Sequence, residues 1–437
     1  MSAGELQVDA EAAAALAPSR GRVRAALHAR TGGLPEPFWW LWLGTLVNRA
    51  GTFIEPFAVL YLTGPRHLSV ATAGTVVTVW GAGSTVAQPL GGYLTDRIGR
   101  RTTLSLGMFA VAVAIGTLAI ARGLPMIMLA ALFVGIVGDI YRPAASAAVA
   151  DLLDGEQRTR AYALQFWAIN LGFSVAAVSA GLLVRLGFST LFIVDAVTSA
   201  VFGLLVLRKV PETRPAAAMD HREHGEPAWR LMLRDRLLLA LVTLFLAYAI
   251  LYGQVYVTLP LAVKDAGLGT SAYGLIMAVN GIVIVIVQPL SLSFIARAPR
   301  ILLLPGSMLL VGGGIALSAA CHSTWAFALT VVVWTLGEIG ASTALFALAA
   351  TLAPEALRGR YMGAVGLAWG ASAMLAPFLG ARTYAASPGA VWLGCLGLSI
   401  VAAIGLIALA VNLPDPAPDP APDTVPDPPA AEQAASE

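Results

Sequence analysis

Apolar segments long enough to cross a lipid bilayer recur along this chain. A membrane-spanning helix needs about 20 predominantly apolar residues. Twelve segments between Pro37 and Asn412 reach this length, and a helix satisfies its own backbone hydrogen bonds in lipid. The segments lie near residues 38–63, 70–94, 103–121, 124–150, 160–184, 188–208, 236–262, 271–294, 301–320, 323–352, 360–384 and 388–412. The pattern predicts an all-α membrane protein with 12 transmembrane helices.

The composition excludes most other classes of protein. Only 12% of the 437 residues are charged and 58% are hydrophobic, whereas soluble domains carry roughly 25% charged residues. No HExxH, CxxC, GxSxG or Walker A motif is present, so we expect no enzyme, no metal site, no cofactor and no direct use of ATP. The two cysteines, Cys321 and Cys395, are expected to be free buried thiols.

The basic residues predict the orientation in the membrane. With the N-terminus inside, 20 of the 27 Lys and Arg residues fall in cytoplasmic tails and loops, as the positive-inside rule requires. The first 36 residues contain no apolar stretch of the kind found in a secretory signal. We therefore expect a multi-pass protein of the cell membrane with both termini in the cytoplasm. Short basic loops of this kind do not indicate nucleic-acid binding, and we expect a monomer.

Polar stretches divide the chain into five parts. The longest polar stretch between apolar segments follows the sixth of them, and the C-terminal residues repeat Asp-Pro and Pro-Ala, a composition typical of an extended, disordered chain. The predicted parts are a cytoplasmic tail at 1–36, a six-helix bundle at 37–208, a cytoplasmic linker at 209–235, a second six-helix bundle at 236–412 and a disordered cytoplasmic tail at 413–437.

An internal repeat relates the two bundles. When the sequence is shifted by 200 residues, the second apolar segment falls on the eighth without a gap. Gly74, Gly81, Gln88, Pro89 and Leu90 then coincide with Gly274, Gly281, Gln288, Pro289 and Leu290, and Arg158 and Arg160 coincide with Arg358 and Arg360. Gly138-Asp139 coincides with Gly337-Glu338 at a shift of 199. Duplicated halves of this kind are typical of secondary transporters.

A charged motif, GGYLTDRIGRR at 91–101, follows the second segment. An arginine-rich inner loop explains the basic residues but not the regular spacing of the glycines and the aspartate. The residues singled out are Gly92, Asp96, Arg97, Gly99, Arg100 and Arg101, with Asp151 as an acid that can pair with the arginines.

At this motif the chain resembles the major facilitator superfamily, whose loop between helices two and three reads G-x-x-x-D-R-x-G-R-[RK]. The resemblance covers residues 37–412 and implies two six-helix bundles that work by alternating access. It also implies that the motif gates transport together with an acid at the inner end of helix four, where Asp151 stands. In the second half Ala296 replaces the aspartate, which assigns gating to the first-half loop.

Other positions depart from the pattern of the drug/proton antiporters in this family. Their Gly-Pro pair late in helix five is replaced by Ala176-Ala177, and an arginine expected early in helix four is missing from Leu129 to Phe133. These departures concern the antiporter assignment and not the fold.

Five charged residues lie inside the predicted helices: Arg49, Glu55, Asp139, Arg142 and Glu338. A charge at the bilayer centre costs about 2.5–3.5 kcal/mol, so each needs a partner, a cavity or a proton. Asp139 and Arg142 are three residues apart and can pair. Arg49 and Glu55 are six apart and would point in different directions from one continuous helix. In the family that the chain resembles, helices one, four, seven and ten line the central cavity, which implies that the five charges surround one path.

These charges supply candidates for proton coupling, namely Glu55, Glu338 and Asp139, because an apolar cavity favours the protonated form of a carboxyl. Ion pairs that merely hold the bundle together are the alternative, and for Asp195 in the sixth segment we favour that structural role. Candidate substrate-binding residues are Arg49, Asn48, Arg142, Trp167, Asn170, Tyr252, Gln254, Asn280 and Trp369, although each aromatic or amide residue can equally be a packing or interface residue.

The sequence thus predicts a proton-coupled secondary transporter that exports a drug-like or secondary-metabolite small molecule. A proton-coupled importer of a small nutrient or peptide is the alternative, since the first helix faintly resembles peptide symporters, with Asn48 in place of their acid. A non-transporting membrane sensor is a third possibility, against which the complete gating motif argues. The expected partners are a small-molecule substrate, protons and the lipid bilayer.

Overall fold

The computed structural model describes residues 33–153, 155–214, 235–352 and 358–411. Within these ranges the chain is helical apart from short turns and contains no strand, so the predicted all-α class is confirmed. The predicted tail at 413–437, most of the tail at 1–36 and most of the linker at 209–235 lie outside the described residues.

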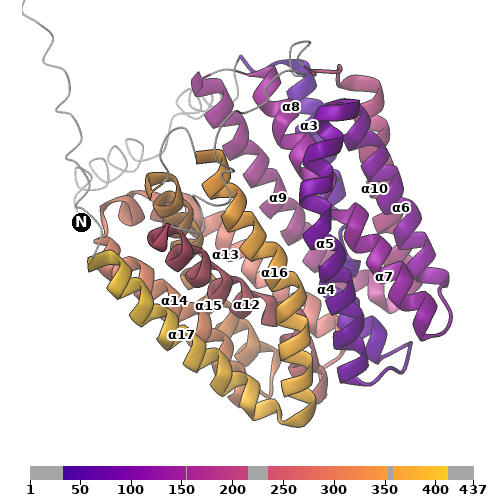
Figure 1. The fold of residues 1–437 in the computed structure, drawn as a ribbon. Helices are drawn as coiled ribbons and strands as arrows, with labels where there is room; N and C mark the ends of the chain where they lie inside the picture. The colour runs from indigo at the N-terminus through magenta and orange to yellow at the C-terminus, as the bar shows by residue number, and fades with distance from the viewer. Residues whose placement is uncertain (1–32, 154, 215–234, 353–357, 412–437) are drawn as a thin grey trace, which may run out of the picture.

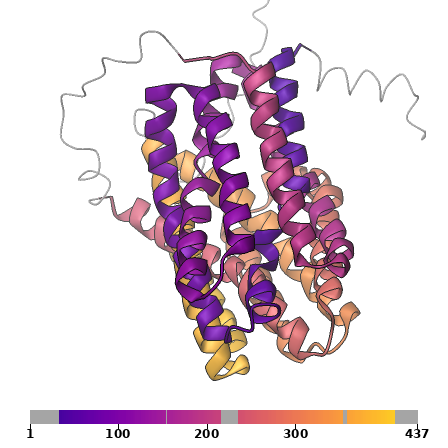
Figure 2. The same ribbon diagram turned by 90° about the vertical axis from the view of Figure 1, so that its right-hand side faces the viewer.

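The helices form two groups that lie side by side (Figure 1). The N-terminal half comprises α3 (Glu36–Ala50), α4 (Ile54–Thr63), α5 (Val70–Ile98), α6 (Arg100–Ile120), α7 (Leu124–Gly138), α8 (Tyr141–Leu152), α9 (Gly155–Leu183), η1 (Val184–Leu186) and α10 (Phe188–Lys209). The C-terminal half comprises α12 (Arg236–Asp265), α13 (Thr270–Arg297), α14 (Arg300–Ala316), η2 (Leu317–Ala320), α15 (Thr324–Leu352), α16 (Arg358–Ala386) and α17 (Pro388–Val411). Figure 2, turned by 90°, shows the N-terminal half in front of the C-terminal half.

Eleven helical stretches of the described chain are long and apolar enough to cross a membrane. The predicted first segment is not among them, because the structure divides it into α3 and α4. The expectation of one continuous helix over 38–63 is therefore wrong. Pro56 favours the division, because a proline ring inside a helix clashes with the carbonyl group four residues earlier, here that of Thr52, and the helix is interrupted at Gly51–Phe53. A proline alone does not break a helix in this protein, since Pro260 lies inside the unbroken α12.

The fourth predicted segment is interrupted in the same way. Helix α7 ends at Gly138 and α8 begins at Tyr141, so Asp139 and Ile140 form a turn. Pro143 stands four residues after Asp139, which repeats the relation between Pro56 and Thr52. The corresponding helices of the C-terminal half, α12 and α15, run without a break.

The two halves meet through residues near one end of the molecule, the end at which α5 begins. A Cβ atom on Gly74 would lie 2.1 Å from the Cβ of Ala381, and one on Gly274 would lie 2.6 Å from the Cα of Gly181. Helix α5 thus packs against α16, and α13 packs against α9, with no room for a side chain at these positions. The repeat-related glycines of the sequence therefore form the contact between the halves.

Polar contacts between the halves lie in the same region. Arg185 Nε donates to Ser271 Oγ at 3.4 Å, and Lys264 Nζ donates to the carbonyl oxygen of Thr63 at 3.3 Å. Thr85 Oγ1 donates to the carbonyl oxygen of Gly370 at 2.9 Å, about halfway along α5. The halves are therefore joined at the end remote from the charged motif, which closes the molecule there.

Candidate functional site

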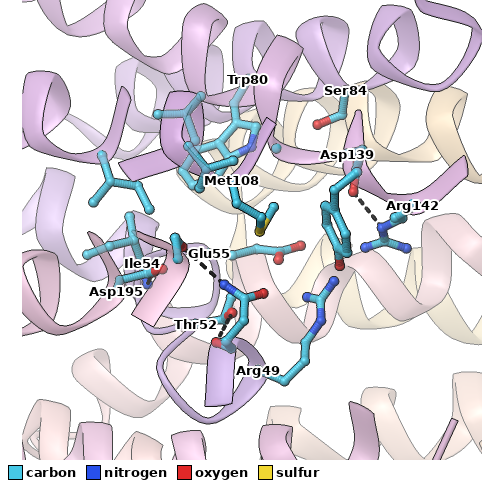
Figure 3. A pocket seen from close by; sticks show the side chains of 17 residues that line it. Arg49, Thr52, Ile54, Glu55, Trp80, Ser84, Met108, Asp139, Arg142 and Asp195 are labelled. Atoms are coloured by element: carbon cyan, nitrogen blue, oxygen red, sulfur yellow. Dashed lines mark hydrogen bonds and ion pairs between the residues drawn. The ribbon is translucent and has the colours of Figure 1, made fainter. Parts of the chain in front are cut away.

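A cavity of about 80 Å³ lies within the N-terminal half, large enough for several water molecules. Helices α3, α4, α5, α6, α7, α8 and α10 contribute to its wall, and Figure 3 shows the side chains that face it. The charged residues among them are Arg49, Glu55, Asp139, Arg142 and Asp195. Four of the five charges singled out in the sequence thus line one cavity, together with Asp195, while Glu338 lies in the other half.

The break between α3 and α4 places Glu55 in this cavity together with Arg49. On one continuous helix the two side chains would point in different directions, and that expectation is wrong because the chain changes course between Gly51 and Phe53. Both side chains reach into the same space in Figure 3. Glu55 is exposed to the cavity and forms none of the ion pairs found among the described residues.

Asp139 and Arg142 form the pair that their spacing predicts. The Nε atom of Arg142 lies 2.6 Å from Oδ1 of Asp139, and the two side chains are 44% and 24% exposed. Their exposure shows that the pair borders open space and is not sealed in the core. Asp139 lies in the turn between α7 and α8, so the second interruption of the half also places an acid at the cavity.

Arg49 lines the same cavity and forms no ion pair with any residue that the structure describes. Its guanidinium carbon lies 5.6 Å from the centroid of the Tyr141 ring, within the range of a cation–π interaction. Its Nε atom is buried without a hydrogen-bond partner among the described residues. A buried donor of this kind is costly unless water or a ligand accepts from it, which makes Arg49 a candidate to bind an anionic group.

Asp195 forms none of the ion pairs found among the described residues, although the sequence favoured a structural ion pair for it, and it contacts the backbone instead. Its Oδ2 atom accepts hydrogen bonds from the backbone N–H groups of Phe53 at 3.0 Å and Ile54 at 3.2 Å. These are free amides at the N-terminus of α4, where a negative charge is favourable. The buried carboxylate therefore fixes the start of α4 and with it the position of Glu55.

Glu338 belongs to a second polar group, within the C-terminal half. Asn280 donates from Nδ2 to Glu338 Oε2 at 2.8 Å and to Thr335 Oγ1 at 3.0 Å. Tyr252, Trp334 and Trp369 surround this group with aromatic rings, and Tyr252 lies 5.7 Å from Trp369 between ring centroids. Three of the predicted binding residues, Tyr252, Asn280 and Trp369, thus come together around one predicted proton carrier.

The other predicted binding residues are dispersed. Asn48 lines the first cavity and donates to Ser199 Oγ at 3.0 Å. Trp167 stacks on Trp42 at 6.3 Å, and Asn170 donates to the carbonyl oxygen of Phe166 in its own helix. Gln254 is buried and donates to the carbonyl oxygen of Ala376 on α16 at 3.2 Å, a contact within the C-terminal half.

The charged motif lies at the turn between α5 and α6. Arg100 Nε lies 2.8 Å from Asp151 Oδ2 at the end of α8, the partner that the sequence suggests, and its Nη1 lies 3.6 Å from Asp96 Oδ1. Asp96 is 75% exposed, so in this conformation Asp151 is the stronger partner. Arg97 also donates to the Tyr93 hydroxyl, and Arg101 donates to the carbonyl oxygen of Leu207. Gly99 has a φ of 94°, a backbone conformation that favours glycine. Gly92 has no other atom within 4 Å of the position of a Cβ.

Sequence reasoning missed Glu212, which also belongs to this network. Its Oε1 atom accepts from the backbone N–H of Arg100 at 2.7 Å, at the start of α6. The residue lies in the stretch predicted as a linker, and only the free amides of the first turn of α6 hinted that an acceptor was needed there.

Spanning helices in two groups, a polar cavity inside the bundle and a charged loop at one end define a multi-pass membrane carrier. The chain belongs to the Major Facilitator Superfamily, whose sequence model matches residues 41–377. Members of this family are transporters of small molecules, so the protein is a membrane transporter and not an enzyme.

Similar proteins include transporters with different printed names. A "Na(+), Li(+), K(+)/H(+) antiporter" of Planococcus maritimus is 23% identical over 364 residues, 76% of this chain and 85% of the relative. A multidrug resistance protein, MdtH, of Aeromonas hydrophila is 27% identical over 381 residues, 85% of this chain and 94% of the relative. A crystal structure of a peptide transporter, POT, in complex with sulfate has a TM-score of 0.72 at 18% identity and covers 87% of this chain and 95% of that one. This last similarity establishes the shared fold.

Proposed function

We propose that the protein is a proton-coupled secondary transporter that exports a drug-like or secondary-metabolite small molecule by alternating access. The observation that carries the proposal is Glu55, a carboxyl exposed to an intramembrane cavity with no ion-pair partner among the described residues. A carboxyl in such a place can exchange a proton with water in the cavity. The names of two relatives, an antiporter and a multidrug resistance protein, support proton exchange and export.

The proposal also assigns an orientation and a gate. In the orientation that the positive-inside rule favours, the charged motif and both termini are in the cytoplasm, and the closed end described above faces outward. The motif residues, with Arg100 paired to Asp151, are proposed to control closure of the inner end. The division into two six-helix bundles with a cytoplasmic linker is part of the same proposal.

The test is a transport assay with purified protein in liposomes that contain a pH-sensitive dye. Cationic, neutral and anionic compounds are added one at a time, and proton movement is recorded for the wild type, Glu55→Gln and Glu36→Gln. Glu36 lies at the start of α3, where it accepts from Trp40 Nε1, and it provides a matched acid-to-amide control outside the cavity.

We expect a compound-dependent proton flux that disappears in Glu55→Gln and persists in Glu36→Gln. Flux that survives in Glu55→Gln would move the coupling role to Glu338 or Asp139. Substrate flux without any proton movement would refute proton coupling. Accumulation of the substrate inside whole cells, in place of depletion, would establish import and reject export.

A further inference from the structure

The C-terminal half contains a cluster of aromatic rings around an acid. Tyr248, Tyr252 and Tyr256 follow one another at intervals of four residues, so they lie along one face of α12. Trp334 of α15 and Trp369 of α16 complete the cluster. Ring centroids lie 5.7 Å apart for Tyr252 and Tyr256, 6.1 Å apart for Tyr252 and Trp334 and 6.3 Å apart for Tyr248 and Trp369. We call these five residues and Glu338 the aromatic cluster.

Glu338 is the charged member, and no cation balances it. It takes part in none of the three ion pairs among the described residues. All three tyrosines of the cluster lie close enough to interact electrostatically with its carboxylate. Its repeat mate Asp139 has Arg142 three residues later, whereas the matching position here is Ala341. An ionised Glu338 therefore gives the cluster a net negative charge.

Asn280 of α13, which donates to Glu338, adds an acceptor beside the cluster, while the hydroxyl groups of the three tyrosines can donate or accept. Asn280 is 1% exposed and uses its amide nitrogen for Thr335 and Glu338. Its Oδ1 atom is buried without a hydrogen-bond partner among the described residues. The faces of Trp and Tyr rings are also negative. The carboxylate, the free amide oxygen and the faces of the three rings that are not fully buried, those of Tyr252, Tyr256 and Trp369, together favour a positive charge.

Four of the six members of the cluster are accessible, whereas Tyr248 and Trp334 are buried. Glu338, Tyr252 and Tyr256 are half-buried, and Trp369 is 39% exposed. It also faces the other half of the molecule: Tyr256 contacts Phe173 of α9 at 6.4 Å, and Gly370, next to Trp369, accepts from Thr85 of α5. A ligand bound here would therefore lie between the two halves.

From this arrangement we propose that the aromatic cluster binds a lipophilic organic monocation, with the rings packed on its apolar groups and Glu338 as its counter-ion. The inference rests on the proposed function in that this cation would be the exported substrate. It assigns Glu338 to substrate recognition and leaves proton coupling to Glu55.

The experiment measures equilibrium binding to detergent-solubilised full-length protein, with no gradient present. The probes are tetraphenylphosphonium and tetraphenylborate, which have almost the same shape and opposite charge, and equilibrium dialysis against protein-free micelles corrects for partitioning. We expect the wild type to bind the cation at least about tenfold more tightly than the anion.

Two variants with matched controls locate the site. Glu338→Gln preserves shape and should weaken cation binding about tenfold or more, whereas Glu36→Gln should not. Trp369→Leu should weaken it about fivefold, within the range for a lost cation–π contact, whereas Trp325→Leu, at a position 85% exposed and remote from the cluster, should not. Size-exclusion profiles and thermal unfolding show that each variant is folded.

Equal binding of the two ions by the wild type, or unchanged cation binding in a folded Glu338→Gln variant, would overturn the inference. Its failure is distinct from that of the proposed function. If the cation binds in a manner that depends on Glu338 but no proton flux occurs in liposomes, the cation site is supported and proton coupling is rejected. If another compound drives proton flux but the cation does not bind, proton coupling is supported and the cation site is rejected.

Discussion

The two halves are related by the internal repeat, yet the acid at the equivalent position has different surroundings in each half. Asp139 of the N-terminal half lies in a helix interruption and is paired with Arg142 at 2.6 Å. Glu338 of the C-terminal half lies in the continuous helix α15 and is held by the Asn280 amide. Asn280 itself occupies the repeat position of Trp80, which lines the cavity of the other half. One half thus has a cavity lined by opposite charges and the other an aromatic cluster with a single acid, and in the proposals made above the first handles the proton and the second recognises the substrate.

The difference extends to the first helix of each half. The N-terminal half interrupts it at Gly51–Phe53 and fixes the second piece with Asp195. The residue 200 positions after Asp195 is Cys395, and the C-terminal half has the unbroken α12 instead. The half with the broken helix has a carboxylate that accepts from the free amides at the start of α4, and the half with the unbroken helix has a cysteine at that position. The acid and the helix interruption therefore occur together.

The largest expected effect concerns the glycines at the contact between the halves. A Cβ on Gly81 would lie 2.0 Å from the backbone oxygen of Ala373, and a Cβ on Gly281 would lie 2.0 Å from the Ser174 hydroxyl. At Gly81 the nearest backbone atom lies 2.0 Å away, whereas at Gly281 the hydroxyl can rotate and the nearest backbone atom, Ser174 Cα, lies 2.8 Å away. Both substitutions therefore require a backbone shift, and Gly81→Ala, which requires the larger one, should reduce transport by about 100-fold and Gly281→Ala by less. Substrate flux in liposomes measures both.

The matched control for these variants is Gly116→Ala, since Gly116 has no other atom within 4 Å of a Cβ. Spin labels at the exposed Leu186 and Leu317 report the distance between the halves at the closed end. That distance should increase in Gly81→Ala. Equal transport by the two repeat mates would show that the contacts on the two sides are equivalent.

The next largest effect is the loss of stability expected when Asp195, the acid at the start of α4, is replaced. Asp195→Ala leaves two buried backbone amides without an acceptor, so it should destabilise the protein by about 2 kcal/mol. Cys395→Ala, at the repeat position, removes no hydrogen bond to a helix terminus and should cost less. Thermal unfolding in detergent compares the two variants. A larger loss for Cys395→Ala would contradict the role of Asp195 as the cap of α4.

A smaller effect is expected at the charged motif. Asp96→Asn should slow transport about tenfold, which corresponds to 1.4 kcal/mol, while the thermal stability of the present conformation changes little because Asp96 is 75% exposed. Ala296→Asp, at the repeat position, should not restore transport to that variant. Unchanged flux in Asp96→Asn would reject the gating role of the motif.

The smallest effect concerns the N-terminal cap of the first helix in each half. Helix α12 is capped by Asp235, which accepts from Leu237 N at 2.9 Å, whereas the residue before α3 is Pro35, which provides no side-chain cap. Partial burial raises the pKa of Asp235, but hydrogen bonds from Tyr361 and from the first turn of α12 outweigh burial and lower that pKa below its ordinary value of 3.8.

Because the folded state lowers the pKa of Asp235, its contribution is present above about pH 4 and is lost as the pH falls through the folded value. Asp235→Asn should reduce stability at neutral pH by about 1 kcal/mol or less and should remove this part of the acid dependence. Unfolding curves between pH 3 and pH 7 measure it. A wild type and variant that differ by the same amount at every pH would refute the assignment.

The features that follow from residues close together in the sequence were predictable. Apolar length gave the spans, the shift of 200 residues gave the duplication and its glycines, and a spacing of three gave the pair of Asp139 and Arg142. The motif around Arg100 carried the family resemblance. Each of these signals is a length, a spacing or a repeat that is visible in the sequence itself.

The features that were missed depend on contacts between distant residues. Pro56 indicates that the helix is interrupted at Gly51–Phe53, but the start of α4 is fixed by hydrogen bonds to Asp195, more than 140 positions away. Glu212 reaches the start of α6 across 112 positions. The aromatic cluster around Glu338 joins three helices, α12, α15 and α16, and no spacing along the chain shows which aromatic residues belong to it.

The two ends of the carrier are held by different forces. Among the described residues, the closed end has glycines against backbone and a few hydrogen bonds but no ion pair, whereas the motif end has Arg100 between two carboxylates. Ionic strength screens exposed charges and leaves close packing almost unaffected. Added salt should therefore weaken mainly the contact of Arg100 with the exposed Asp96, should weaken the more buried pair with Asp151 much less, and should leave the glycine contacts of the closed end almost unchanged.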